Sequence, residues 1–424
     1  MNDQHILKIN KLLSKGVKIP TPQTIEIGEE VDIERISAGV KIYPGCRIYG
    51  KSTLILQGAE LGYEGPVTVK DCQIGPDVKL KAGFFDNAVF LEKAEAGSGS
   101  HVRGGTILEE EAGIAHTVGL KQTILFPFVT LGSLINFCDC FMAGGTSRKD
   151  HSEVGSSYIH FNYTPNQDKA TASLLGDVPR GVMLNQRPIF LGGQGGLVGP
   201  CRLEYGSVIA AGCVYRKDEP RPGRLLMAGQ GRAGSIPFTS GIYQGVKRII
   251  LNNIIYIANL IALMQWYENI RYQFISPGFP DELLTGLKDK LNMGITERIK
   301  RLNEFAQKMP ESLRLYQESA GENASQSLIA QKKELNEKWP ELKAYLNSDH
   351  FDINQGRAGD LSLMEAFMKK IDKGIEKSGK KYIRVIKGLE PDESETGTRW
   401  LQRIVDRIVS ESFEIIPAFG SVNI

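Results

Sequence analysis

The sequence has no excess of charge of either sign and few aromatic residues. It contains 51 Lys and Arg residues against 49 Asp and Glu residues, a net charge of +2, and aromatic residues make up 8% of its 424 residues. A protein that holds nucleic acid through its phosphates concentrates basic side chains on one face. The balanced composition therefore predicts a soluble globular protein whose partners do not include nucleic acid.

Long hydrophobic runs and targeting segments are also lacking. Residues 1–16 have the pattern of a short helix, without the apolar core and small-residue cleavage site of a secretory signal. The most apolar stretch, residues 249–264, contains Asn252, Asn253 and Asn259 and is shorter than the roughly 20 residues that span a membrane. We expect a cytoplasmic protein with no membrane span, and a buried or interfacial helix at residues 249–264.

Cysteines are few, six in all, and Cys138 and Cys140 are the one closely spaced pair. This spacing fits neither a disulfide framework nor a Cys-x-x-Cys zinc or redox site. The sequence shows no other cluster with the spacing of metal ligands, so we expect no metal.

What the sequence does contain is an aliphatic residue at every sixth position in three separate stretches. In each stretch the residue four places further on is small or β-branched, so two positions in six suit a protein interior. The aliphatic runs are Ile36, Ile42, Ile48 and Leu54; Val102, Leu108, Ile114 and Leu120; and Leu191, Leu197, Leu203 and Ile209, and the small positions include Val40, Cys46, Ser52, Thr106, Ala112, Cys201, Ser207 and Cys213. The three cysteines at these positions are expected to be structural.

A period of six fits neither an amphipathic helix nor an ordinary strand, but it fits one flat face and one corner of a triangular solenoid. Three such faces close a coil of about eighteen residues. Chance periodicity in a Gly-rich β protein is the alternative, and three independent runs argue against it. We therefore predict a mainly β fold, a left-handed parallel β-helix (hexapeptide solenoid) followed by a C-terminal α-helical domain.

After the repeat come a charged stretch rich in Pro and Gly and then helical patterns. We assign residues 1–24 to an N-terminal helix and lead-in, 25–218 to the β-helix, 219–240 to a connector and 241–424 to the α-helical domain. The expected helices of this domain cover residues 242–274, 281–308, 325–347, 361–386 and 393–413. Asp281 is the expected cap of the second helix, and Pro340 is a candidate break in the third.

Two glycine-rich motifs are explained by solenoid corners. Residues 45–52 match the G-x-x-x-x-G-K-[ST] pattern of a phosphate-binding loop, but that loop requires a helix after it. Here Cys46, Ile48 and Ser52 keep the phase of the repeat and no helical pattern follows. The glycines of residues 192–196 likewise suit tight corners and close stacking rather than a dinucleotide site.

The order of several segments resembles a known family. Residues 101–110 followed by Val118 to Lys121 resemble "RPG…LLEG…VEMK" in the acetyltransferase domain of the bifunctional bacterial enzyme that makes UDP-N-acetylglucosamine, a member of the hexapeptide-repeat acyltransferases. Further on, residues 162–163, 169–171, 175–177 and 189–192 resemble "NYDG", "KFKT", "IGDD" and "VFVG", and residues 197–200 and 207–212 resemble "LVAP" and "ATIAAG". The resemblance covers about residues 90–218.

The resemblance implies an acetyltransferase acting on a sugar phosphate or nucleotide sugar, with acetyl-CoA as co-substrate and ligands bound between the subunits of a homotrimer. Two fixed cations, Arg103 and Lys121, would face the substrate phosphate. The alternative is that these are ordinary surface charges and that residues 162–163 form an ordinary turn. The full set of implied substrate-binding residues is Arg103, Lys121, Asn136 and Lys169, and that of acetyl-CoA-binding residues is Asn162, Tyr163, Gly193 and Ala211.

The departures from the family concern the catalytic base and the front of the chain. Ser133 occupies the position of the family's general-base His, and Asn136 that of a substrate-contacting Tyr. Acyl transfer to an amine needs a group that accepts a proton near neutral pH, and histidine is the side chain suited to this. His160 is the first candidate to replace the base and His116 the second, and His151 is also near in sequence.

A second departure is that the residues before the first repeat cannot hold the family's uridyltransferase domain, so we expect no uridylyl transfer. The function therefore has two interpretations. One is a CoA-dependent acyltransferase with a relocated base, and the other is a non-catalytic sugar-nucleotide-binding or scaffold protein that has lost the base.

Overall fold

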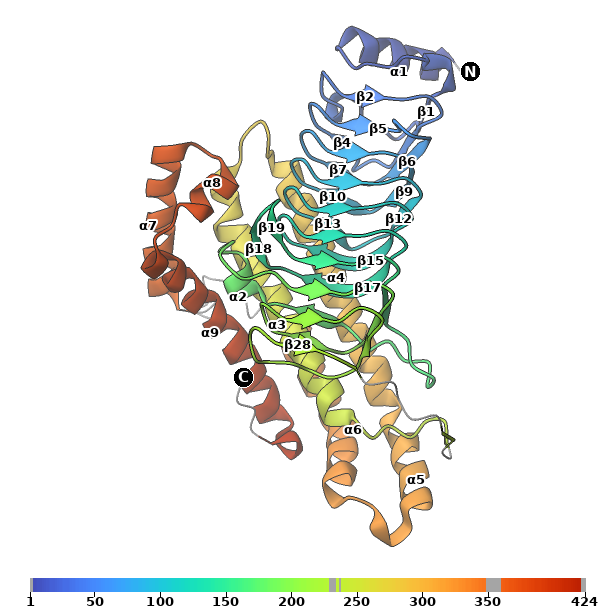
Figure 1. Ribbon diagram of the computed structural model, residues 1–424, viewed down its shortest axis with the longest axis vertical. Coiled ribbons are helices and arrows are strands. Elements are labelled where there is room, and N and C mark those ends of the chain that lie inside the picture. The colour runs from blue at the N-terminus through green and yellow to red at the C-terminus, as the bar shows by residue number, and fades with distance from the viewer. Residues whose placement is uncertain (1–2, 229–233, 236–237, 348–359, 421–424) are drawn as a thin grey trace.

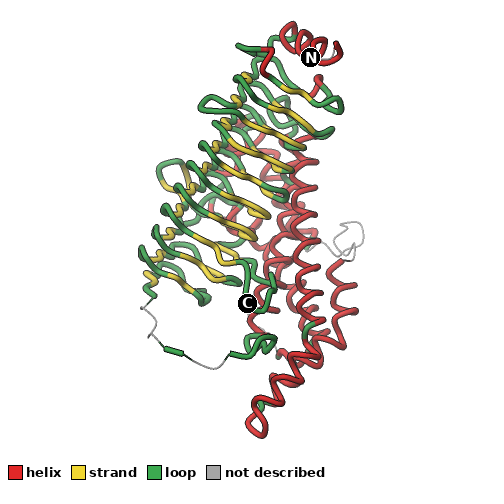
Figure 2. Tube along the Cα trace, turned by 90° about the vertical axis from the view of Figure 1, so that its right-hand side faces the viewer, coloured by secondary structure: helices red, strands yellow, loops and turns green. Residues whose placement is uncertain are grey.

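The structure is a computed structural model of the chain, and it describes residues 3–228, 234–235, 238–347 and 360–420. A long solenoid of stacked coils occupies the N-terminal half, and long helices run beside it (Figures 1 and 2). Parts of the predicted connector 219–240, namely residues 229–233 and 236–237, lie outside the described residues.

The solenoid has about 11 turns and three faces, and every strand on a face pairs in parallel with the strand one turn away. The first face is a ten-stranded sheet. Its strands are β2 (Lys41–Ile42), β5 (Glu60–Leu61), β8 (Lys79–Leu80), β11 (Glu95–Ala96), β14 (Gly113–Ile114), β16 (Thr130–Leu131), β20 (Glu153–Val154), β23 (Phe190–Leu191), β26 (Val208–Ile209) and β28 (Leu225–Leu226).

The second and third faces are joined because two strands, β15 (Gly119–Leu125) and β17 (Asn136–Met142), bend from one face to the next. The bends lie at Gln122 and Asp139, whose φ angles are 51° and 60°. The second face also contains β1 (Glu26–Ile27), β3 (Arg47–Tyr49), β6 (Val67–Lys70), β9 (Gly83–Asp86), β12 (Ser100–Val102), β21 (Ile159–Phe161), β24 (Gly196–Val198) and β27 (Val214–Tyr215), and the third contains β4 (Leu54–Ile55), β7 (Gln73–Ile74), β10 (Ala88–Phe90), β13 (Thr106–Leu108), β22 (Ser173–Leu175) and β25 (Arg202–Leu203).

The predicted parallel solenoid is confirmed, and so is its interior. Val102, Leu108 and Leu120 of the second predicted run are fully buried, and Cys46 and Cys201 lie inside at small positions. All six cysteines are free and buried. Stacking like residues at the same position of each turn removes them from water, at about 1.5–3 kcal/mol for each large aliphatic side chain.

The first predicted run departs from the structure at its last member. The inward residue on the third face is Ile55, which pairs with Ile36 in one direction and Ile74 in the other, and not Leu54. The reason is an extra residue in the preceding corner, where Gly50 has a φ of 89° and Ser52 is exposed instead of buried. The phosphate-binding-loop pattern of residues 45–52 lies in this corner and is followed by strand β4, not by a helix.

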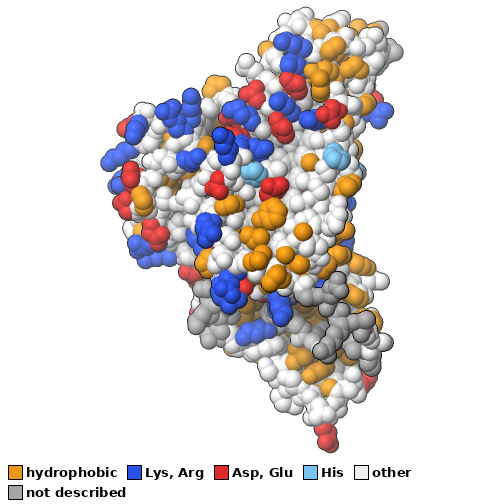
Figure 3. Space-filling view, in the orientation of Figure 1, with side chains coloured by type: hydrophobic (Ala, Val, Ile, Leu, Met, Phe, Trp, Pro, Cys, Tyr) orange, Lys and Arg blue, Asp and Glu red, His pale blue; other side chains and the backbone are white. Residues whose placement is uncertain are grey.

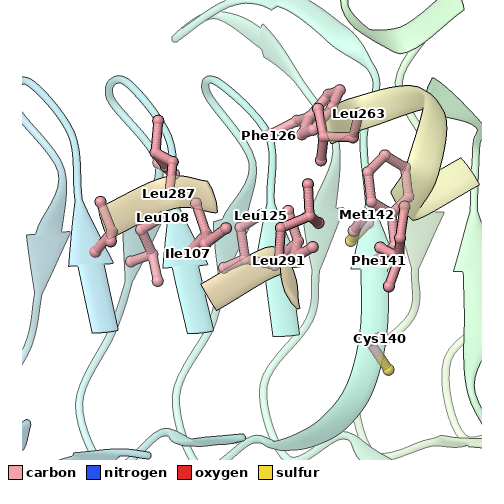
Figure 4. Packing of buried hydrophobic residues seen from close by; sticks show 14 of the residues in the cluster. Ile107, Leu108, Leu125, Phe126, Cys140, Phe141, Met142, Leu263, Leu287 and Leu291 are labelled. Carbon is pink, nitrogen blue, oxygen red and sulfur yellow. The ribbon is translucent and has the colours of Figure 1, made fainter. Parts of the chain in front are cut away.

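The third face is buried on both sides, because helices cover its outer surface. Ile107 and Leu108 are adjacent in β13 and both are fully buried. Figure 4 shows Leu287 and Leu291 of α4 over Ile107 and Leu125. A strand buried on two faces carries consecutive apolar residues rather than alternating ones.

The helical region begins with α3 (Val246–Asn269), which continues into η3 (Arg271–Phe274). The further helices are α4 (Asp281–Gln307), α5 (Met309–Ala320), η4 (Gly321–Asn323), α6 (Gln326–Asn347), α7 (Leu361–Ser378), α8 (Tyr382–Lys387), α9 (Pro391–Ile415) and η6 (Pro417–Phe419). Pro280, and not Asp281, is the cap of α4, and Pro340 lies inside α6 without interrupting it. Our sequence predictions omitted α5 and joined α7 to α8, which are separated at Gly379, where φ is 68°.

Among the described helices, α3 and η3 together (Val246–Phe274) have the length and apolarity of a membrane span, but 83% of the most apolar window is buried inside the structure. Its asparagines bind the solenoid. The Nδ2 atom of Asn253 donates to the carbonyl oxygen of Ala170 (2.9 Å), and Oδ1 of Asn259 accepts from the backbone N–H of Val178 (2.9 Å) in α2 (Val178–Gly181). These contacts describe a core helix packed on the solenoid.

Both ends of the solenoid carry additional structure. At the N-terminal end, α1 (Asp3–Ser14) buries Ile9 and Leu12 on the first turn (Figure 1). Two short 3₁₀ helices follow α1, η1 (Pro22–Thr24) and η2 (Ile33–Arg35). In the middle of the solenoid, an antiparallel hairpin of β18 (Gly145–Ser147) and β19 (Asp150–His151) interrupts the repeat. At the other end, β28 pairs with β26, so the ladder extends past residue 218 into the segment assigned to the connector.

Candidate functional site

One residue from each turn stacks along the corner between the first and second faces. Backbone hydrogen bonds hold this stack in register. The N–H of Leu134 donates to the carbonyl of His116 (3.1 Å), that of Ser157 to Ser133 (2.8 Å), and that of Gly212 to Gly193 (2.9 Å). We call the stack the corner column, and its members are Ser98, His116, Ser133, Ser156, Gly193 and Ala211.

Two predicted residues make contact in the corner column. The Nδ1 atom of His116 lies 2.8 Å from the Oγ atom of Ser133, one turn further along the chain. His116 is exposed and Ser133 is half-buried. The Nε2 atom of His116 has no hydrogen-bond partner among the described residues, so it is the ring nitrogen that faces solvent. When one ring nitrogen donates to a fixed oxygen, the other carries the lone pair that accepts a proton.

Ser133 is itself held by the next turn, because its backbone N–H donates to the Oγ atom of Ser156 (3.1 Å). Beyond Ser156 the corner column continues with the small residues Gly193 and Ala211. A side chain at Gly193 would lie 2.7 Å from the carbonyl oxygen of Ser156, so this corner has no room for one. Because Gly193 and Ala211 have little or no side chain, the surface of the corner column is low at these two turns.

The two predicted phosphate-binding cations lie side by side at the opposite edge of the second face. The N–H of Arg103 donates to the carbonyl of Leu120 (2.9 Å), which sets Arg103 next to Lys121 on the adjacent rung, about 4.8 Å away along the ladder. Arg103 is exposed and reaches the Sγ atom of Cys138 (3.8 Å). Asn136, exposed at the start of β17, lies on the same face.

Next to this edge, the predicted loop residues are tied to α4. The Nδ2 atom of Asn162 donates to Oδ2 of Asp139 (2.8 Å), and Arg298 of α4 binds the other carboxylate oxygen (2.5 Å). Arg298 also donates to the carbonyl oxygen of Lys169 (3.1 Å). Asp139 and Arg298 are both buried, and neither is among the site residues predicted from the sequence. Tyr163 is 55% exposed, with the Lys169 ammonium 6.0 Å from its ring centroid.

His160, our first candidate for the base, points into the solenoid. Its Nδ1 atom lies 2.6 Å from the carbonyl oxygen of Cys138 and its Nε2 atom 2.8 Å from Oγ of Ser173, and the side chain is buried. Burial lowers the pKa of His160 to about 4, opposed in part by the negative charge of Asp139. Both nitrogens are occupied and out of reach of a surface ligand. His151 lies in the β18–β19 hairpin, 3.7 Å from Glu153.

The predicted site residues thus form two groups at opposite edges of the second face. His116 and Lys121 belong to the same turn, five residues apart, which corresponds to about 16 Å at the rise of a β-strand. A pyranose ring with its phosphate is shorter than this, whereas a nucleotide sugar or acetyl-CoA is long enough to extend across the face. No group of three or more His, Cys, Asp or Glu side chains with metal-binding geometry occurs in the part of the chain that the structure describes.

The fold is consistent with a hexapeptide-repeat acetyltransferase domain, and half of the chain is homologous to bifunctional GlmU proteins. Bifunctional protein GlmU of Thermotoga maritima is 29% identical over 214 residues, which are 50% of this chain and 42% of the relative. GlmU of Clavibacter sepedonicus is 30% identical over 210 residues, 50% of this chain and 38% of the relative. The match thus spans less than half the length of either relative, and no family model matches the chain.

Proposed function

We propose that the protein is a CoA-dependent acyltransferase of the sugar-nucleotide acetyltransferase type, in which His116 is the general base. The proposal is carried by one observation, the contact between His116 and Ser133 at the position where the resembling family has its base. Homology to the GlmU proteins supports the reaction class. The acceptor is an amino-sugar phosphate or a nucleotide sugar, and acetyl-CoA is the co-substrate.

In the proposed reaction the acceptor amine attacks the thioester carbonyl of acetyl-CoA. Nε2 of His116 accepts the proton that the amine loses as the new C–N bond forms, and as the C–S bond breaks the protonated His116 gives this proton to the departing sulfur, which releases the CoA thiol. Ser133 fixes the ring through Nδ1, and when Nδ1–H donates to Oγ of Ser133 the lone pair that accepts the proton is on Nε2. Arg103 and Lys121 of a neighbouring copy would bind the anionic part of the acceptor, because paired cations form strong charge-assisted bonds with phosphate and those of the same copy lie too far from His116 for a sugar phosphate to reach both.

The low surface along Gly193 and Ala211 would accept the pantetheine arm of acetyl-CoA. Tyr163 and Lys169 would take its nucleotide end, since an exposed aromatic ring and an ammonium group suit a base and a phosphate. The two groups lie at separate edges of one face, which favours a site completed by a neighbouring copy. We accordingly propose a cytoplasmic homotrimer with parallel solenoid axes, and light scattering tests its mass.

A second candidate function is a sugar-nucleotide-binding scaffold without catalysis, and the specific observation in its favour is that Ser133 replaces the family's base. The two functions are separated by one experiment. A panel of amino sugars and sugar phosphates is incubated with acetyl-CoA, and released thiol is measured alongside calorimetric binding. Turnover supports the acyltransferase, and binding of a sugar nucleotide without thiol release supports the scaffold.

A further inference from the structure

A cavity of about 850 Å³ lies at the corner between the third and first faces of the solenoid, whereas the corner column lies between the first and second. Its walls are the solenoid corners at residues 92–93 and 110–111, the segment from η3 to Phe279, the last turn of α7, and α8 with its flanking residues. Of the described residues that line it, none belongs to the candidate acyl-transfer site. Its size is within the range of about 300–1,000 Å³ typical of small-molecule sites.

The wall of this cavity is strongly basic. Seven of the lining residues are Lys or Arg and three are Glu, in a protein whose overall charge is nearly balanced. Figure 3 shows blue side chains gathered over the region of α7 and α8. The basic residues are Lys93, Arg271, Lys377, Lys380, Lys381, Arg384 and Lys387.

Helix electrostatics explain only part of this cluster. Lys377 lies in the last turn of α7, where a cation offsets the partial negative charge of the helix end. That reason does not apply to Lys93, which lies on a solenoid corner and pairs with Glu92 (2.8 Å), or to Arg271 in η3. Cations from three separate parts of the chain therefore converge on the cavity.

Arg271 is a buried charged residue in the wall of the cavity. Its side chain is 1% exposed, and its guanidinium lies between two aromatic rings, 3.8 Å from the ring centroid of Tyr382 and 4.3 Å from that of Phe279. Nη2 donates to Oε1 of Glu110 (2.6 Å). Nε and Nη1 have no partner among the described residues, and buried donors without partners are rare in folded proteins.

The lining also includes aromatic and aliphatic side chains, among them Phe274, Phe279 and Tyr382. Basic groups bind phosphate, while aromatic rings stack on a planar base. We propose that this cavity binds a nucleoside phosphate, with the phosphates among the basic residues of α7 and α8 and the base against Phe279, which is half-buried whereas Phe274 and Tyr382 are buried. This site is independent of the proposed acyl transfer.

The test is calorimetric titration of the full chain with ADP, and with pyrophosphate and adenosine as its two halves. The variant is the double substitution Lys377→Ala and Lys381→Ala, which changes two exposed lysines of the cavity wall. The matched control is Lys369→Ala with Lys373→Ala, two exposed lysines of α7 outside the wall. We expect at least a tenfold weaker Kd for ADP in the first variant, no change in the control, and weaker binding at higher salt.

ADP should bind more tightly than pyrophosphate or adenosine alone. Failure of the wild type to bind ADP at millimolar concentration would overturn the proposal, as would equal weakening in both double variants. If pyrophosphate binds as tightly as ADP, the nucleoside does not contribute to binding, which would contradict the proposed role of Phe279. Tyr163→Ala separates the two sites, because loss of ADP binding in that variant alone would assign ADP to the proposed acetyl-CoA groove and contradict the cavity.

Discussion

The Nδ1 atom of His116 lies 2.8 Å from the Oγ atom of Ser133, across one turn of the solenoid. The two residues come from strand ends 17 positions apart and meet because each occupies the same corner of successive turns. A histidine and the serine at the expected base position are thus in contact at the surface. This contact changes the order of our candidates, since His160 is buried and both of its ring nitrogens are occupied.

The paired cations are expected to bind the phosphate of the acceptor. Arg103→Ala and Lys121→Ala should each weaken the binding of glucosamine 1-phosphate about 10- to 100-fold, as measured by calorimetry, because each removes a charge-assisted contact. Arg47→Ala is the control, since Arg47 is exposed on the same face several turns away. Equal affinity in wild type and all three variants would make Arg103 and Lys121 ordinary surface charges.

The buried pair Arg298–Asp139 is expected to hold the loop that contains Asn162 and Lys169. Arg298→Met leaves the carboxylate of Asp139 buried without its cationic partner, and should lower the free energy of unfolding by about 3–5 kcal/mol in urea denaturation. Arg301→Met, which removes pairs with Glu297 and Glu304 on the same helix, should cost less than about 1 kcal/mol. Adding Asp139→Asn to Arg298→Met should recover part of the loss. A single-variant cost as small as that of the control would refute this role.

The interior of the solenoid could be predicted from the sequence because one position in each face must be aliphatic. The prediction failed at Leu54, where one extra corner residue moves the inward position to Ile55, and counting by six cannot detect such an insertion. The adjacent apolar pairs Ile107–Leu108 and Ile124–Leu125 do indicate a strand that is covered on both sides, and both members of each pair are buried.

The contacts of the candidate site could be predicted only for residues that are about one solenoid turn apart in the sequence. His116 and Ser133 are separated by about one coil of eighteen residues, so their stacking follows from the repeat. Arg298 and Asp139 are 159 residues apart, and nothing local marks a buried arginine on an amphipathic helix. Contacts of that kind depend on how α4 packs, which the solenoid pattern does not specify.

Glu109 is expected to make stability depend on pH. Burial raises the pKa of its carboxyl from 4.5 to about 7, reinforced by the nearby charge of Glu110. The folded state therefore binds a proton more strongly than the unfolded state, and the stabilisation present below pH 4.5 is lost as the pH rises to about 7. Glu109→Gln should remove this loss, at most about 3 kcal/mol, in denaturation curves at several pH values.

Glu92→Gln is the control for Glu109→Gln, because the Glu92 side chain is 51% exposed. It should leave the pH dependence of stability as in the wild type. A wild-type stability that does not fall between pH 4.5 and 7 relative to Glu109→Gln would contradict the assignment.

His160 should have the opposite pH dependence. Its lowered pKa means that the unfolded state binds the proton first, so stability is lost as the pH falls from 6.5 to about 4. His160→Gln can keep both hydrogen bonds without titrating, and should reduce this loss, again by at most about 3 kcal/mol, while leaving turnover unchanged. His101→Gln, at an exposed position, should do neither. Loss of turnover in His160→Gln would return His160 to the catalytic candidates.

The most direct test of the account is thiol release from acetyl-CoA, with an amino-sugar phosphate as acceptor, in wild type, His116→Ala and Ser133→Ala. General-base catalysis typically contributes about 10²- to 10⁴-fold, so His116→Ala should lower turnover by at least about 100-fold. Ser133→Ala only removes the contact that orients the His116 imidazole, so it should lower turnover less than His116→Ala does. Wild-type turnover that is unchanged in His116→Ala would contradict the role of His116 as the general base.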